Sequence, residues 1–158
     1  MNTFVIDFGI FFDDEWDWVN SEVTSIVDWL LRSRSVVREA RLTIPARDSQ
    51  VRARWRELAH AKDRGVLVVV GTDKIQGVLP LEIANLVDAG FSPLEAISAA
   101  TGIAARVVGI DSEVGTIEQG KFADLIAVDE RPDENIEDLF GPVFIMVGGT
   151  DFSRLSFR

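Results

Sequence analysis

The sequence predicts an α/β fold, and the clearest sign is the run Val66–Val70. These five consecutive Val and Leu residues contain no polar residue. A continuous apolar run is typical of a strand buried on both faces, as in a parallel sheet. Amphipathic helices are predicted on both sides of the run, at residues 47–64 and at Leu81–Ala89. This alternation of helix and strand indicates an α/β domain.

Two further elements are predicted before this region. Phe4–Phe12 is apolar and aromatic, which favours a strand followed by a loop. Glu15–Leu31 carries apolar residues at spacings of three and four, which predicts an amphipathic helix. Residues 47–64 repeat that pattern, and Gly65 follows as a C-terminal cap.

The strongest helix start signal lies at Ser92. Ser92 is a good N-cap, Pro93 occupies the first helical position, and Glu95 completes a capping box. The helix is expected to continue to about Ala100. Glycines end the neighbouring helices, at Gly90 after Leu81–Ala89 and at Gly109 after Ala104–Val108.

Beyond Gly109 the pattern changes to short strands. They are predicted at Gly115–Gly120, Ala123–Asp129 and Val143–Val147, each bounded by turn residues. A small β unit therefore follows the α/β region, and we place the boundary near Gly109.

Composition excludes several kinds of chemistry. The chain has 158 residues, one histidine and no cysteine, so disulfides, thiolate zinc sites and cysteine nucleophiles are impossible. It has 16 Lys+Arg against 26 Asp+Glu, a net charge of −10, which argues against a general nucleic-acid partner. No apolar run approaches the ~20 residues of a membrane helix, so no membrane partner is expected. The start lacks a leader pattern, and together with the missing cysteines this favours a cytoplasmic protein.

Several segments in a fixed order are similar to one known family. Together they resemble the C-terminal part of the amidohydrolase superfamily, most of all its imidazolonepropionase and Xaa-Pro dipeptidase-like branch. The segments are Gly71-Thr72-Asp73, Asp88–Ala96, Ala99-Ala100-Thr101, Ala104-Ala105-Arg106, Gly115–Lys121 and Ala123-Asp124-Leu125.

The resemblance implies the C-terminal part of a (β/α)8 TIM-like barrel plus strands of a small β-sandwich. Residues 1–109 would form the last strands and helices of the barrel, and residues 110–158 the end of the sandwich. Phe4–Phe12 would then be the seventh barrel strand and Val66–Val70 the eighth. The Gly-Lys-x-Ala-Asp-Leu segment, which includes Asp124, would be structural.

The resemblance also implies a metal-dependent hydrolase of amide or cyclic amide bonds, with zinc as the usual metal. Asp73 matches the family aspartate that contacts the metal and takes a proton from the attacking water. A carboxylate at the C-terminal end of a barrel strand lies on the catalytic face, which agrees with that role. The plain alternative is that Asp73 only caps the following turn. Lys74 departs from the small residue that is common after this aspartate. It could pair with Asp73 and lower its basicity, or contact an acid group of the substrate, but a solvated loop lysine is the simpler expectation.

Most of the family's metal ligands are missing from this sequence. No His-x-His occurs, and His60 falls in a predicted surface helix where the family has no ligand. One carboxylate does not hold a catalytic zinc, which generally needs three protein ligands. We therefore expect the chain alone to bind no zinc and to be inactive, with its small amide or dipeptide-like substrate bound only by an intact enzyme.

Other candidate features have simpler explanations. The four tryptophans are expected to pack in the core rather than line a pocket. The arginine-rich residues 32–64 are expected to form a solvated helix face rather than an anion site. Asp13-Asp14-Glu15 is ordinary chemistry for a helix start rather than a cation site.

Two hypotheses remain open at this stage. In one, the chain is part of an amidohydrolase whose other ligands lie outside it. In the other, it is a non-catalytic, self-associating protein. Part of a barrel leaves strand edges and apolar faces unpaired, so both hypotheses predict a homo-oligomer.

Overall fold

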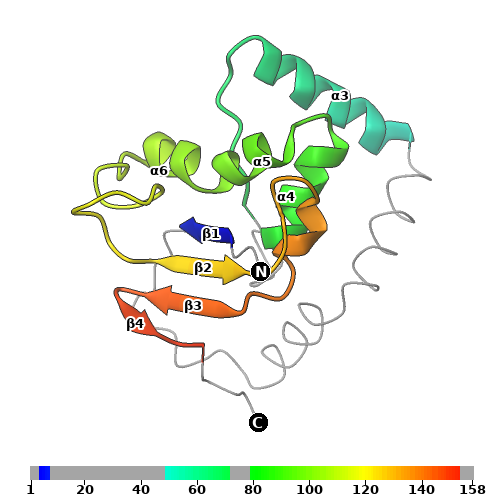
Figure 1. Cartoon of the computed structure of the whole chain (residues 1–158). Helices are drawn as coiled ribbons and strands as arrows, with labels where there is room; N and C mark the ends of the chain where they lie inside the picture. Colours follow the sequence, from blue (N-terminus) through cyan, green and yellow to red (C-terminus); the bar gives the residue numbers. More distant parts are fainter. Residues whose placement is uncertain (1–3, 8–48, 72–78, 154–158) are drawn as a thin grey trace, which may run out of the picture.

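The computed structural model describes residues 4–7, 49–71 and 79–153 (Figure 1). In this part of the chain, helices lie on one side of a small antiparallel sheet. The predicted helix Glu15–Leu31, Asp13–Glu15 and three of the four tryptophans lie outside the described residues.

The sheet has four strands in the order β1-β2-β3-β4, and every neighbouring pair is antiparallel. The strands are β1 (Phe4–Asp7), β2 (Leu125–Val128), β3 (Phe144–Val147) and β4 (Thr150–Asp151). The strands predicted at Ala123–Asp129 and Val143–Val147 are therefore confirmed, whereas the β3–β4 hairpin was not predicted.

The first strand pairs differently from the sequence expectation. In β1, Ile6 lies opposite Ile126 of β2, so this strand joins the small sheet and not a parallel barrel sheet. The placement of Phe4–Phe12 as a seventh barrel strand is thus wrong for its described part, Phe4–Asp7, because this part pairs antiparallel with β2 whereas barrel strands are parallel. The domain boundary near Gly109 stays a prediction.

Residues 115–120 form a turn rather than the predicted strand. Gly115 and Gly120 have φ angles of +92° and +98°, in the left-handed region that favours glycine. An added Cβ on Gly115 would lie 2.6 Å from the Cβ of Ala105. Both glycines therefore adopt turn conformations, and Gly115 also lies close to α6. A regular β-strand does not form at residues 115–120.

The described residues form four α-helices and one 3₁₀ helix. They are α3 (Ser49–Asp63), α4 (Leu79–Asp88), α5 (Pro93–Ala100), α6 (Gly102–Val108) and η1 (Ile136–Leu139). The four α-helices were predicted within a few residues, whereas η1 was not. The left-handed glycines that end α4 and α6 are those expected, Gly90 at φ +104° and Gly109 at φ +87°.

Helix α5 begins with the predicted capping box. The backbone N–H of Glu95 donates to Ser92 Oγ at 3.3 Å, and the backbone N–H of Ser92 donates to Glu95 Oε2 at 2.7 Å. Pro93 follows at the first helical position. Two backbone donors that would otherwise be unsatisfied at the helix start are thus paired.

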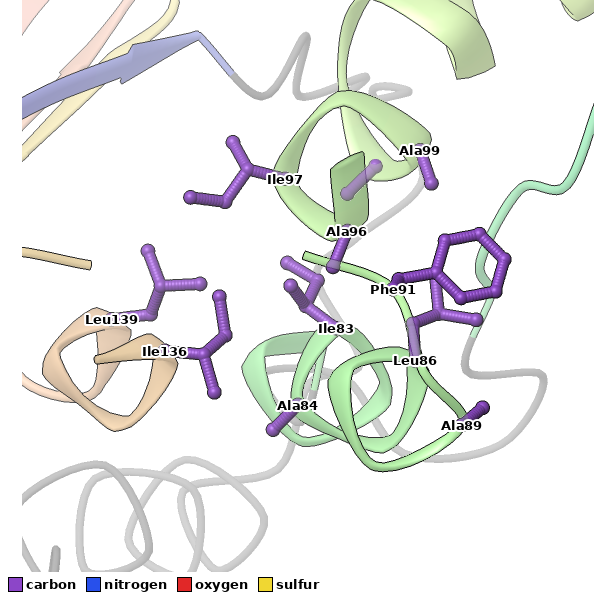
Figure 2. Close-up of a cluster of buried hydrophobic side chains, with 11 residues drawn as sticks. Ile83, Ala84, Leu86, Ala89, Phe91, Ala96, Ile97, Ala99, Ile136 and Leu139 are labelled. Carbon is purple, nitrogen blue, oxygen red and sulfur yellow. The ribbon is translucent and has the colours of Figure 1, made fainter. Parts of the chain in front are cut away.

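The hydrophobic core lies between α4, α5 and η1 (Figure 2). Ile83 and Ala84 of α4 and Ala96 of α5 are fully buried, and Leu139 of η1 is 1% exposed. Trp55 of α3 packs against this cluster, in agreement with the core role expected for the tryptophans. Sequence-distant segments therefore converge on one core around α4.

The segment 66–70 is extended but is not part of the sheet that the described residues form. Val68 and Val70 pack against the core, whereas Val66, Leu67 and Val69 are 55%, 48% and 41% exposed. The prediction of a strand buried on both faces is therefore wrong for this structure. Burial on both faces requires neighbouring strands, and none of the strands in the described residues pairs with this segment.

Candidate functional site

Asp73, the predicted catalytic and metal-binding residue, lies outside the described residues, as does Lys74. Asp73 is two residues beyond Gly71, where the extended segment ends, and α4 begins at Leu79. The described structure therefore fixes both flanks of the predicted site, and the assignment of Asp73 stays a prediction.

The flank before the site is held by α3. This helix ends at a left-handed Gly65, and the Val66 N–H donates back to the carbonyl of Ala61 at 3.0 Å. Two contacts of Lys62 hold α3 against the start of α5. Lys62 Nζ forms an ion pair with Glu95 Oε2 at 3.1 Å, and it lies over the Phe91 ring, 4.9 Å from the ring centre. The direction in which the chain enters segment 66–71 is thus set by packing between two helices.

The flank after the site is held by the core itself. Leu79 opens α4 and packs against the buried cluster, and one turn later Ile83 and Ala84 are fully buried. On the other flank, Val70 packs against the same cluster. Val70 and Leu79, on either side of the predicted site, therefore rest on the same core.

The described residues contain no metal centre. No group of three or more His, Cys, Asp or Glu side chains in this part of the chain lies close enough together to hold an ion. His60 is exposed on α3, as expected for a surface helix histidine. A zinc ion needs about four ligands, three of them usually from protein, so the described side chains do not fit one.

A shallow hollow of about 330 Å³ lies between the α5–α6 corner and the turn at 115–121. The sequence analysis treated the adjoining residues Gly115–Gly120 as a strand bounded by turn residues and missed this cluster of charges. The lining residues are Ser98, Gly102, Ile103, Arg106, Asp111, Thr116, Glu118 and Lys121. The sequence did contain a signal for this cluster, because Thr116, Glu118 and Lys121 all fall within the six-residue stretch 116–121.

Two of the charged side chains of this hollow, Glu118 and Lys121, are paired with each other. Thr116 Oγ1 donates to Glu118 Oε1 at 2.6 Å, and Lys121 Nζ lies 3.5 Å from the same oxygen. The pKa of Glu118 is lowered, first by the hydrogen bond from Thr116 and then by the charge of Lys121. A carboxyl group with a lowered pKa is a poorer general acid than a free one, and no lining residue is a histidine.

Asp124 is the one buried carboxylate among the described residues, and its surroundings are structural. It is 7% exposed, and its Oδ1 accepts the backbone N–H of Gly148 at 2.6 Å. This bond ties the start of β2 to the β3–β4 turn. The geometry agrees with the structural role expected for the Gly-Lys-x-Ala-Asp-Leu segment.

No helix in the described part of the chain is long and apolar enough to cross a membrane.

Comparison with known proteins relates almost the whole chain to one family. The sequence model described as "Amidohydrolase family" matches residues 3–150. A solved structure of a Xaa-Pro dipeptidase, with methionine bound in its active site, is 27% identical with a TM-score of 0.59. That alignment covers 84% of this chain and 33% of the dipeptidase.

Two curated proteins match shorter stretches. 5-Methylthioadenosine/S-adenosylhomocysteine deaminase from Symbiobacterium thermophilum is 37% identical over 73 residues, which are 46% of this chain and 17% of that protein. Ochratoxinase from Aspergillus niger is 41% identical over 76 residues, which are 46% of this chain and 16% of that protein. The chain thus matches only a small part of the length of each curated relative.

Proposed function

Because this chain belongs to the amidohydrolase family, we propose that it forms the C-terminal part of a metal-dependent hydrolase of amide or cyclic amide bonds. The observation that carries the proposal is the family match over residues 3–150, which confirms the resemblance found in the sequence. The likeness to a Xaa-Pro dipeptidase agrees with the branch expected from the motifs. Family membership implies the (β/α)8 barrel class, and segment 66–71 is our candidate for its last strand.

We assign Asp73 the roles of one metal ligand and proton acceptor in an intact site. Its place just after segment 66–71 supports this, because side chains at the C-terminal ends of barrel strands form the catalytic face. The metal, proposed to be zinc, would supply a water that ionises near neutral pH. Asp73 is a single ligand, so the other ligands must come from residues outside the described part of the chain.

The substrate class follows from the names of the relatives. They include a dipeptidase, a deaminase and ochratoxinase. A small-molecule amide or dipeptide-like substrate would suit both the Xaa-Pro dipeptidase and the branch of the family that the motifs resemble. We propose this class for the intact enzyme, and we propose that the 158-residue chain alone is inactive.

The test of this proposal is the complete reading frame. We expect the DNA upstream of Met1 to encode, in frame, a His-x-His pair, a Lys and two further histidines. A protein extended by that segment should hydrolyse Xaa-Pro dipeptides with zinc, and Asp73→Asn should lower kcat about 10²–10⁴-fold. Asp129→Asn, at an exposed position after β2, is the matched control and should retain activity. In-frame stop codons directly upstream would contradict the proposal.

A second candidate function, a self-associating non-catalytic protein, is favoured by one observation. The apolar segment 66–70 exposes three of its five side chains and pairs with none of the strands in the described part of the chain. Light scattering after size-exclusion chromatography should then show an oligomer at micromolar concentration, and a clean monomer would contradict it.

A further inference from the structure

The hollow between the α5–α6 corner and the turn at 115–121 contains two charged groups that are not paired within it. Arg106 and Asp111 line it together with the ion pair of Glu118 and Lys121. Within the described part of the chain, neither the Arg106 guanidinium nor the Asp111 carboxylate forms a hydrogen bond or an ion pair. One cationic and one anionic group are therefore available to a ligand in the same hollow.

The walls of the hollow are held in place by close packing. They come from one continuous stretch of chain, residues 98–121, in which α5, α6 and the turn lie side by side (Figure 1). Gly102 of α6 approaches the turn so closely that an added Cβ would lie 3.3 Å from the carbonyl oxygen of Gly115. Ala105 of α6 and Val114 before the turn are each 5% exposed. A site whose walls are already ordered loses less entropy when a ligand binds.

The balance of charge indicates the class of ligand. Two cations, Arg106 and Lys121, stand against two anions, Asp111 and Glu118, so the lining residues carry no net charge at neutral pH. A simple anion would satisfy Arg106 alone, and a simple cation would satisfy Asp111 alone. A zwitterion satisfies both, because a guanidinium binds a carboxylate through two parallel hydrogen bonds and a carboxylate accepts hydrogen bonds from an ammonium group.

Ile103 and the size of the hollow narrow this class further. Ile103 lies three residues before Arg106 on α6, hence on the same face of the helix, and it lines the same hollow. An apolar group beside the charged end of a ligand would contact it. The volume of about 330 Å³ is at the small end of the roughly 300–1,000 Å³ typical of ligand sites, which suits a molecule of the size of an amino acid.

We propose that this hollow binds a free α-amino acid with an apolar side chain, with Arg106 holding its carboxylate and Asp111 its ammonium group. The site uses only residues 98–121. The inference is therefore independent of the proposed hydrolase and of Asp73.

The first experiment titrates the isotope-labelled 158-residue chain with L-leucine and follows the backbone amide signals by NMR. Leucine should bind with a Kd on the order of 1 mM, because the hollow is shallow, and the signals that shift should belong to residues 98–121. Two probes of similar shape, 4-methylpentanoate without the ammonium group and 3-methylbutylamine without the carboxylate, should each bind about tenfold more weakly or worse. Equal binding of the three probes, or no shift with leucine, would overturn the inference.

The second experiment repeats the titration on variants of the two charged groups. Arg106→Gln and Asp111→Asn should each raise the Kd for leucine about tenfold or more, because each removes one charge-assisted contact. Asp111→Asn should also abolish the preference for leucine over 4-methylpentanoate, since the ammonium group then has no partner. A general loss of structure would not produce that change in selectivity.

Two control variants locate the binding. Glu113→Gln changes an exposed acid in the same stretch that does not line the hollow, and it should bind leucine as the wild type does. Asp73→Asn should also bind normally, which separates this site from the proposed metal site. Unchanged binding in Arg106→Gln and Asp111→Asn, or binding lost in Asp73→Asn, would overturn the inference while leaving the proposed function intact.

Discussion

Helices α4 and α5 and the extended segment 66–70 are built from similar apolar residues, yet they bury them to very different degrees. Ile83, Ala84 and Ala96 of the helices have no exposed surface, whereas Leu67 of the segment is 48% exposed. A helix satisfies its backbone within itself and needs only a partner for one face. A strand needs neighbouring strands to satisfy its backbone. Segment 66–70 has none among the described residues, and its side chains are therefore less buried than those of the helices.

The largest contrast between the two regions is expected from truncating one buried and one exposed side chain. Ile83→Ala should lower the free energy of unfolding by about 2–5 kcal/mol, because it opens a cavity in a packed core. Leu67→Ala should change it by no more than about 0.5 kcal/mol. Urea denaturation of dilute protein measures both, and equal losses would show that the segment is as well packed as the helices.

The turn at Gly115 provides a second contrast, this time between two left-handed glycines. Gly115→Ala should destabilise the protein by about 3 kcal/mol, because the new Cβ would lie 2.6 Å from Ala105 Cβ in addition to the strained φ. Gly109→Ala shares the positive φ but meets no atom within 4 Å, so about 1 kcal/mol is expected. Thermal denaturation of the two variants compares them. Similar losses would mean that backbone strain alone, and not contact with α6, decides the effect.

The cap of α5 should make a smaller contribution. Ser92→Ala removes the acceptor for the Glu95 N–H and should lower stability by about 1 kcal/mol. Ser98→Ala, at an exposed position on the same helix, is the control and should be nearly neutral. Urea midpoints of the two variants test the cap, and a neutral Ser92→Ala would show that α5 is held by packing alone.

The smallest expected effect is a pH dependence at the same cap. The pKa of Glu95 is lowered, first by the hydrogen bond from the Ser92 backbone and then by Lys62. A lowered pKa contributes stability above the ordinary value of 4.5, and this is lost as the pH falls through the lower value in the folded state. Glu95→Gln should therefore reduce the loss of stability with falling pH in that acidic range. Identical pH profiles for the two proteins would contradict the assignment.

Local signals in the sequence explain why the helical region was predictable. Ser92, Pro93 and Glu95 specify the start of α5, and Gly90 and Gly109 specify helix ends, because each acts within a few residues of itself.

The features that were predicted wrongly or not at all depend on contacts between residues far apart along the chain. The pairing of β1 with β2 joins residues more than a hundred positions apart, and no local pattern in Phe4–Asp7 specifies it. Segment 66–70 has the composition of a buried strand, but burial needs neighbours that a sequence pattern does not provide. The turn at Gly115 was mistaken for a strand because its contact with Ala105 is tertiary. For the candidate site, the motifs indicated the family, whereas the role of Asp73 stays a prediction because this residue lies outside the described part of the chain.

The central claim is that this chain carries one ligand of an amidohydrolase metal centre and not the centre itself. Elemental analysis of the purified 158-residue chain, after equilibration with zinc and removal of the free ion, tests it most directly. We predict far less than one zinc per chain, with the same content in the wild type and in Asp73→Asn. About one tightly held zinc per chain, lost in Asp73→Asn, would contradict the account.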